Sequence, residues 1–184
     1  MIKDFMIGER KLRVVDGLLN AEHIKQLANA LNASSYRRME IATPKSSHIK
    51  HHSLEMTTEQ LKHLQLFDVS VAALSDFNST HKFKIFRQYC NICFYGDLLL
   101  PHRDANPEQS DITAMWYLNP HWDREWGGET LFFDESSQTS IGVELVPGRL
   151  VLFDGALLHV GKSPNRQCYE GRLSLAIKFY ADPG

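Results

Sequence analysis

The chain has 184 residues, of which 43% are hydrophobic, and its formal charges nearly cancel at −2. This suits one globular domain over residues 1–184 with a sizeable core, and the balanced charge argues against a dedicated nucleic-acid binder. No apolar run approaches the roughly 20 residues that a membrane helix needs, and charges interrupt the N-terminal segment, which excludes a signal peptide. We therefore expect a cytoplasmic protein without a nucleic-acid or membrane partner. The sequence indicates no particular oligomeric state.

The first part of the chain predicts a short strand and two helices. The strand covers residues 12–16, and Asn20 then caps a helix over residues 21–32, in which apolar residues recur at helical spacing. Thr57 begins a capping-box pattern, which predicts a second helix over residues 57–77. Both helices are expected to support a sheet.

Residues 42–56 lie between these helices and indicate a loop, because they contain proline, serines and histidines without a clear period. Such a segment could close over a site as a lid, or it could be a passive surface loop. The adjacent His51 and His52 could bind a metal, but their position better suits solvated loop residues.

From residue 82 onward the pattern changes to strands separated by turns. The predicted strands cover residues 83–95, 112–118, 129–133, 141–146, 149–153 and 172–180. So many strands with short links predict an antiparallel sandwich or jelly roll. We therefore expect a mainly β domain with its β core at roughly 82–181, supported by two or three helices at roughly 18–80.

The three cysteines, an odd number, do not form a disulfide framework. Cys90 and Cys93 make a CxxC motif, but they lie inside a predicted strand, where positions i and i+3 point to opposite faces. No second CxxC completes a zinc site. Buried packing roles are expected for both residues.

The most informative pattern is His102-Arg103-Asp104 followed by His159. Two neutral imidazoles and one carboxylate can hold a non-heme Fe(II) on one face and leave the other face open. His102 and Asp104 follow a long strand and can share one face. A second HxD triplet, His121-Trp122-Asp123, lies in a polar connecting turn and is excluded on that ground. The alternative for His159 is a core histidine satisfied by a backbone carbonyl.

Arg172 opens the final predicted strand, thirteen residues after His159. By alternation it shares one face with Ser174, Ala176 and Lys178. An arginine facing inward needs an anionic partner, and its planar fork can bind a carboxylate bidentately. A small dicarboxylic co-substrate would supply this partner. A zinc hydrolase could use the same three metal ligands but would not need the arginine.

Three longer segments resemble the prolyl-hydroxylase type of Fe(II)- and 2-oxoglutarate-dependent dioxygenases, which have a double-stranded β-helix (jelly-roll, cupin-like) fold. Residues 115–133, MWYLNPHWDREWGGETLFF, are similar to the stretch after the HxD motif in hypoxia-inducible-factor and collagen-type prolyl hydroxylases. Residues 143–155, VELVPGRLVLFDG, resemble the strand pair before the distal histidine, and residues 14–31 resemble the opening strand and helix. The resemblance covers the chain from about Leu12 to its C-terminus.

This resemblance implies roles for particular residues. His102, Asp104 and His159 would bind Fe(II), and Arg172 would bind the distal carboxylate of 2-oxoglutarate. Further co-substrate contacts would come from Tyr117, hydrogen-bonded to the same carboxylate, from Tyr95 lining the pocket, and from Ser174. Candidate substrate residues are Arg87, Tyr89 and Asn91, by alternation on the long strand, together with Arg103.

The implied reaction is hydroxylation of an unactivated C–H bond with O₂, releasing succinate and CO₂, with ascorbate as a stimulant. Asp104 favours hydroxylation, because halogenase relatives lack this carboxylate. The sequence departs from the family in the short segment at residues 97–101 and in the longer loop between His159 and Arg172, both near the substrate opening. We expect an amino acid or another small, natural-product-like substrate. The alternatives are a prolyl or other residue in a protein or peptide, and a non-catalytic sensor.

Overall fold

The computed structural model describes residues 1–182. Its helices and strands, in chain order, are β1 (Ile2–Ile7), β2 (Arg10–Val15), α1 (Ala21–Asn32), β3 (Arg37–Glu40), η1 (Pro44–Ser46), β4 (His51–Glu55), α2 (Thr58–His63), α3 (Phe67–Phe77), β5 (Lys82–Cys93), β6 (Ile112–Tyr117), η2 (Arg124–Trp126), β7 (Thr130–Phe133), β8 (Thr139–Val143), β9 (Leu150–Asp154), β10 (His159–Gly161) and β11 (Arg172–Asp182).

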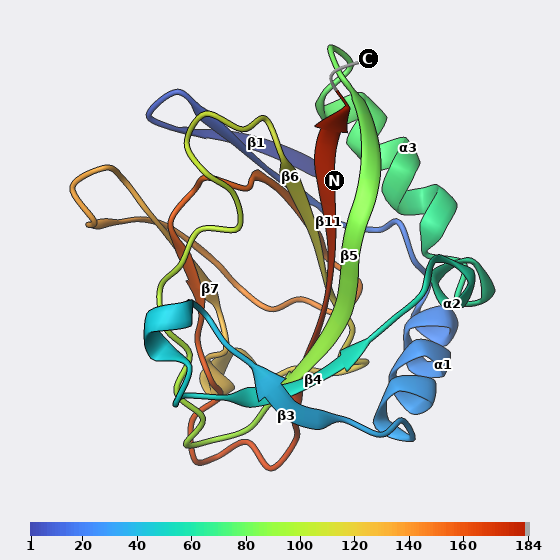
Figure 1. Cartoon of the computed structure of the whole chain (residues 1–184). Helices are drawn as coiled ribbons and strands as arrows, with labels where there is room; N and C mark the ends of the chain where they lie inside the picture. Colours follow the sequence, from blue (N-terminus) through green and yellow to red (C-terminus); the bar gives the residue numbers. More distant parts are fainter. Residues whose placement is uncertain (183–184) are drawn as a thin grey trace.

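Two antiparallel sheets form the β core. The larger has the order β1-β2-β9-β6-β11-β5-β4-β3, and the smaller has the order β10-β7-β8. In Figure 1, β7 lies opposite β5 and β11, and the helices lie on the other side of the large sheet. The prediction of a mainly β jelly roll with supporting helices is confirmed.

The outer face of the large sheet packs against the helices. Alternation along β11 sends Leu173, Leu175 and Ile177 into this layer, where they are fully buried in one cluster with Leu27 of α1 and Leu74 of α3. Burying such aliphatic side chains contributes about 1.5–3 kcal/mol each. The helices therefore stabilise the large sheet from its outer face and do not contribute residues to the site on its inner face.

The inner face of the large sheet meets the small sheet across a second apolar cluster. Val151 and Phe153 of β9 and Met115 of β6 pack there with Phe132 of β7. Several inward residues of β5 and β11 are polar, and Tyr89, Asn91, Arg172 and Ser174 among them line a cavity between the two sheets. The same alternation thus builds an apolar wall and a polar site.

Several boundaries differ from the sequence-based predictions. The helix predicted over residues 57–77 is two helices, because the chain turns at Gln65, whose φ of 57° is left-handed. β1 and β3 were not predicted, and β4 replaces the second half of the loop expected at 42–56. β4 escaped detection because its inward residues are polar, which removes the hydrophobic alternation that marks a strand. Since β4 pairs with β5, residues 51–55 belong to the sheet and cannot act as a lid.

None of the helices in residues 1–182 has both the length and the apolar composition required to cross a membrane.

Candidate active site

His102, Asp104 and His159 meet at one end of the cavity between the sheets. One possible ligand atom from each residue lies within 4.8 Å of the others. The two histidines also pair through their backbones, each N–H lying 3.0 Å from the carbonyl oxygen of the other. The Asp104 and Ala105 amides both donate to the Gly155 carbonyl. Backbone pairing therefore brings residues from distant parts of the chain into one cluster.

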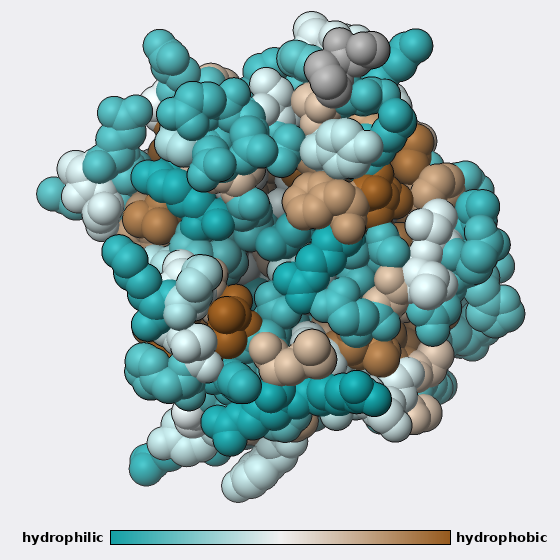
Figure 2. Space-filling model, viewed as in Figure 1, coloured by the Kyte–Doolittle hydropathy of each residue, from teal (hydrophilic) through white to brown (hydrophobic). Residues whose placement is uncertain are grey.

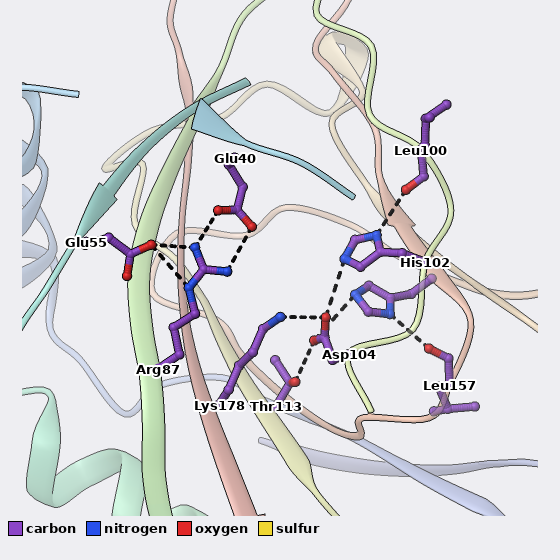
Figure 3. A network of polar contacts seen from close by, with 10 residues as sticks. Glu40, Glu55, Arg87, Leu100, His102, Asp104, Thr113, Leu157 and Lys178 are labelled. Atoms are coloured by element: carbon purple, nitrogen blue, oxygen red, sulfur yellow. Dashed lines mark hydrogen bonds and ion pairs between the residues drawn. The ribbon is translucent and has the colours of Figure 1, made fainter. Parts of the chain in front are cut away.

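Both imidazoles are oriented for metal binding. His102 Nδ1 lies 3.0 Å from the Leu100 carbonyl oxygen, and His159 Nδ1 lies 2.9 Å from that of Leu157 (Figure 3). A carbonyl only accepts, so each Nδ1 carries a proton, and Nε2 of each ring is the nitrogen that a metal would bind. Burial lowers the pKa of His159 to about 4, which keeps this ring neutral at physiological pH.

Asp104 is the charged centre of the cluster. Thr113 Oγ1 donates to its Oδ2 over 2.7 Å, and Lys178 Nζ lies 2.8 Å from its Oδ1. Burial opposes ionisation, but the nearby His159, His102 and Lys178 hold the pKa of Asp104 well below its ordinary range. The carboxylate is therefore ionised, as a metal ligand must be. Two imidazole nitrogens and one carboxylate are a donor set that fits Fe(II).

Arg172 lies on the inner face of β11, only 3% exposed. Its Nε donates to the Gly128 carbonyl over 2.7 Å, Nη1 to Ser174 Oγ over 3.0 Å, and Nη2 to Thr130 Oγ1 over 3.0 Å. A guanidinium has five N–H donors, so one donor on each terminal nitrogen remains. Within residues 1–182, Arg172 forms no ion pair with a carboxylate. The arrangement leaves a buried guanidinium group at the cavity wall, held in place by three neutral acceptors.

Gly128 gives the arginine this position. Its φ is +81°, a conformation that favours glycine, and a Cβ there would lie 2.9 Å from the Trp122 ring and 3.5 Å from Arg172 Cδ. Gly128 therefore allows the close packing of Trp122 and Arg172 at this turn.

Tyr117 packs its ring against the Arg172 guanidinium. Its ring centroid lies 5.2 Å from the guanidinium carbon, and its hydroxyl donates to Thr130 Oγ1 over 2.7 Å. It is fully buried and does not line the cavity. This position does not support the expected direct contact between Tyr117 and the co-substrate. Thr130, a residue that no sequence signal singled out, lines the cavity instead.

The cavity joins the histidine cluster to Arg172. Its polar lining includes Ser174, Asn91 and Tyr89, and its apolar lining includes Met115 and Phe153. Tyr89 and Asn91 therefore face the cavity, as alternation on the long strand predicts. Asn91 Oδ1 is buried there without a hydrogen-bond partner among the described residues.

Three predicted site residues lie elsewhere, and the first is Tyr95. Its side chain is 63% exposed and does not line the cavity, so the prediction for this residue is wrong. β5 ends at Cys93, after which the chain turns: Asp97 Oδ2 accepts from the Phe94 amide over 2.8 Å, and Gly96 has a φ of +90°. This turn directs Tyr95 to solvent, and Cys93 occupies the cavity end of β5.

The two arginines predicted to contact substrate already have protein partners. Arg87 binds both Glu40 and Glu55, with 3.1 Å between its Nη1 and Glu40 Oε1 and 3.2 Å between its Nε and Glu55 Oε1 (Figure 3). Arg103 is exposed and donates to the Ala156 carbonyl. Neither lines the cavity, which corrects the predictions for both residues.

His51 also differs from its prediction as a solvated residue. It is 7% exposed on β4 and lines the cavity, and burial lowers its pKa. By contrast, His121 packs edge-on against Trp126, outside the metal cluster, and Cys90 and Cys93 are buried free thiols, as expected.

Comparison with known proteins gives the chain a family. The model of the 2OG-Fe(II) oxygenase superfamily matches residues 90–180, about half of the chain, which include the histidine cluster and Arg172. No curated protein sequence matches significantly.

Solved structures share the fold at low sequence identity. A prolyl-4-hydroxylase from Pseudomonas putida has a TM-score of 0.65 at 19% identity, covering 93% of this chain and 92% of that chain. A Trichoplax adhaerens prolyl hydroxylase, in complex with a hypoxia inducible factor oxygen degradation domain peptide fragment, has a TM-score of 0.69 at 15% identity, covering 93% and 83%.

The non-heme alpha ketoglutarate dependent epimerase SnoN from nogalamycin biosynthesis has a TM-score of 0.65 at 18% identity, covering 91% of this chain and 76% of that chain. These structures show the shared fold, and the family match, which includes the histidine cluster and Arg172, shows that the chain belongs to the 2OG-Fe(II) oxygenase superfamily, whose enzymes use Fe(II), 2-oxoglutarate and O₂.

Proposed function

We propose that this enzyme hydroxylates an unactivated C–H bond of an amino acid or another small molecule, with His102, Asp104 and His159 binding Fe(II) and Arg172 binding 2-oxoglutarate. The single observation that carries this proposal is the state of Arg172. It is a buried cation in the wall of the cavity that contains the histidine cluster, and it is held by three neutral groups with no ion pair to a carboxylate within residues 1–182. An unpaired buried charge is costly, and the distal carboxylate of 2-oxoglutarate supplies the missing anion.

When bound, Fe(II) and 2-oxoglutarate supply the oxidising power for O₂-dependent C–H cleavage. The protein positions the reactants. Thr130 and Ser174 fix the guanidinium plane of Arg172, so this group is preorganised to bind a carboxylate. Thr113 fixes the Asp104 carboxylate in the same way. Met115 and Phe153 form an apolar wall that limits water around the site.

A protein or peptide substrate is the second candidate, because the structural neighbours include prolyl hydroxylases. One further observation favours it. Phe94, Tyr95 and Leu98, in the turn after β5, are 42–63% exposed, and Tyr169 is 94% exposed. Exposed aromatic side chains are enriched at protein interfaces. However, the face in Figure 2 is mostly hydrophilic with separate hydrophobic patches, rather than one continuous apolar groove.

The direct test is uncoupled turnover. Purified protein with Fe(II), ascorbate and 2-oxoglutarate is expected to release succinate slowly without added substrate, and a small-molecule library should contain compounds that accelerate this release. Calorimetry with Ni(II), which does not turn over, should detect metal-dependent binding of 2-oxoglutarate. Failure to bind 2-oxoglutarate, together with failure to consume it, would overturn the proposal.

A further inference from the structure

Asn91 has a polar atom that the protein leaves unsatisfied. It lies on the inner face of β5 and lines the cavity, and its Oδ1 is shielded from solvent without a hydrogen-bond partner among the described residues. Its neighbours in register, Ser53 on β4 and Ser174 on β11, supply no donor to this atom. A buried acceptor that lacks a donor is costly. The cavity at Asn91 therefore requires a ligand that donates a hydrogen bond.

His51 is a second cavity residue whose polar atoms lack protein partners. Its side chain is 7% exposed, and its ring forms no hydrogen bond within residues 1–182. This separates it from His102 and His159, whose Nδ1 atoms lie 3.0 Å and 2.9 Å from backbone carbonyl oxygens. Burial lowers the pKa of His51, so its ring is neutral at physiological pH. A neutral imidazole offers one N–H donor and one acceptor.

The pairing of β4 with the last part of β5 places these two groups close together (Figure 1). Ser53 lies directly opposite Asn91, so His51, two residues before Ser53, is the diagonal neighbour of Asn91. Residues in this relation lie about 7–8 Å apart, within reach of long side chains. One small group between them can therefore contact both.

The co-substrate cannot supply the hydrogen bond that Asn91 lacks. 2-Oxoglutarate has two carboxylates and a keto group, and all of these oxygens only accept hydrogen bonds at neutral pH. Arg172, at the wall of the same cavity, is the kind of donor that such oxygens need. The donor for Asn91 Oδ1 therefore comes from a different molecule, which is the substrate.

The charges of the cavity wall decide what kind of donor this is. Apart from histidines, Asp104 and Arg172 are the charged side chains that line the cavity within residues 1–182. Under the proposed function the first binds the metal and the second binds the co-substrate. An ammonium or a carboxylate of the substrate would thus be buried without a counter-charge, which is costly. The substrate group that lies between Asn91 and His51 is therefore uncharged.

We infer that Asn91 and His51 bind a secondary amide of the substrate, whose N–H donates to Asn91 Oδ1 and whose carbonyl accepts from the His51 ring. The N–H and C=O of such an amide point in opposite directions, so one amide can lie between the two side chains. This inference rests on the proposed function and narrows it to molecules that carry an amide, in place of a free amino acid whose two charges both enter the cavity. Asn91 and His51 are then specificity-determining residues.

Binding measurements with matched ligands test this inference. Calorimetry on the Ni(II)-loaded protein with 2-oxoglutarate bound measures the affinity for each of the twenty common amino acids and for its N-acetyl N-methylamide, in which two secondary amides replace the two charges. We expect at least one such capped residue to bind, and its free form to bind at least about tenfold more weakly. If 2-oxoglutarate binds but no capped residue does, or if the free form binds equally well, the inference is overturned and the proposed function stands.

A longer ligand distinguishes the two sources of the amide. An N-acetylated, C-amidated pentapeptide with the same central residue presents the same amides within a peptide chain. Affinity equal to that of the capped residue identifies a small amide as the substrate, whereas binding tighter by about tenfold or more identifies a peptide. Either result supports an amide at Asn91 and His51.

Variants assign the contact to the two residues. Asn91→Leu removes the acceptor at similar size, and His51→Phe removes the ring donor. Each should weaken binding of the capped residue by about tenfold and leave the affinities for Ni(II) and 2-oxoglutarate within about twofold. Asn29→Leu, at an exposed position of α1, is the matched control and should change none of these affinities.

Two results with Asn91→Leu would overturn the inference. Unchanged affinity for the capped residue would mean that water satisfies Asn91 Oδ1, and a selective loss of 2-oxoglutarate affinity would mean that the Asn91 amide faces the co-substrate. A merely structural role would instead lower the midpoint of urea unfolding and leave the preference for the capped residue intact. We expect a midpoint at least as high as in the wild type, because a buried acceptor without a partner has been removed, and the preference lost.

Discussion

Arg172 and Lys178 are two cations on the same face of the same strand, yet the fold treats them in opposite ways. Arg172 is surrounded by the neutral acceptors Gly128, Ser174 and Thr130, whereas Lys178 binds the carboxylate of Asp104. Neutral acceptors fix the direction of a charge without cancelling it. The comparison teaches that the residues around a buried cation can fix its orientation without neutralising its charge. A buried cation that is held only by neutral acceptors therefore indicates a binding site for an anionic ligand.

The largest expected effect comes from Asp104, on which the Lys178 side of this comparison depends. Asp104→Ala should reduce succinate formation by about three orders of magnitude, because the metal loses its only charged protein ligand. Succinate release and calorimetric Ni(II) binding would measure this change. The control is Asp123→Ala, in the other HxD triplet, which should stay within twofold of the wild type. Substantial turnover in the Asp104 variant would contradict the assigned ligand set.

Removing Arg172 tests the other side of the comparison. Arg172→Met should weaken 2-oxoglutarate binding by roughly 100-fold or more, since each hydrogen bond to a charged group contributes about 1.5–3 kcal/mol. Metal affinity should change little, and calorimetry can measure both. Arg124→Met, at an exposed arginine paired with Glu144, is the control. Unchanged 2-oxoglutarate affinity in the Arg172 variant would exclude this residue as the anchor.

Arg87 offers a third cation, whose charge is cancelled within the protein. Arg87→Met should cost about 1–3 kcal/mol of unfolding free energy, because Glu40 is left largely buried without its partner. The affinity for 2-oxoglutarate should stay within about twofold, since Arg87 does not line the cavity. Urea unfolding and calorimetry together measure this split. A large loss of 2-oxoglutarate affinity without a loss of stability would instead make Arg87 a ligand-binding residue.

The smallest effect is expected at Tyr117. Tyr117→Phe removes one donor from Thr130, which still accepts from Arg172, so 2-oxoglutarate should bind less than about fivefold more weakly. A direct hydrogen bond from Tyr117 to the ligand carboxylate would instead make the loss about tenfold or more. Tyr180→Phe, on the outer part of β11, serves as the control for the loss of a hydroxyl group.

The sequence predicts the parts of this site that depend on local periodicity. Alternation along β11 places Arg172, Ser174 and Lys178 on one face, and alternation along β5 places Tyr89 and Asn91 in the cavity. It fails for Tyr95 because the strand ends two residues earlier, at a turn set by Asp97 and Gly96. Strand ends depend on such side-chain contacts, which a period-two pattern does not contain.

The remaining errors have another cause, since they concern partners far apart in sequence. Arg87 faces the interior as predicted, but Glu40 and Glu55 come from strands whose polar inward residues hide them. His51 has the composition of a loop and becomes part of the cavity wall only because β4 pairs with β5. Thr130 supports Arg172 across the two sheets. These contacts depend on which strands lie side by side or face each other. The family resemblance predicts the fold but not these particular contacts.

The reciprocal backbone pair between His102 and His159 also has a consequence for protein engineering. This backbone pair sets the spacing of the two imidazoles. Their spacing therefore does not depend on the number of residues between His102 and His159. The turn at residues 134–138, between β7 and β8, lies within that intervening segment, and most of its residues are exposed. A peptide tag or a small reporter domain inserted at this turn would lengthen the connection while the two histidines kept their distance.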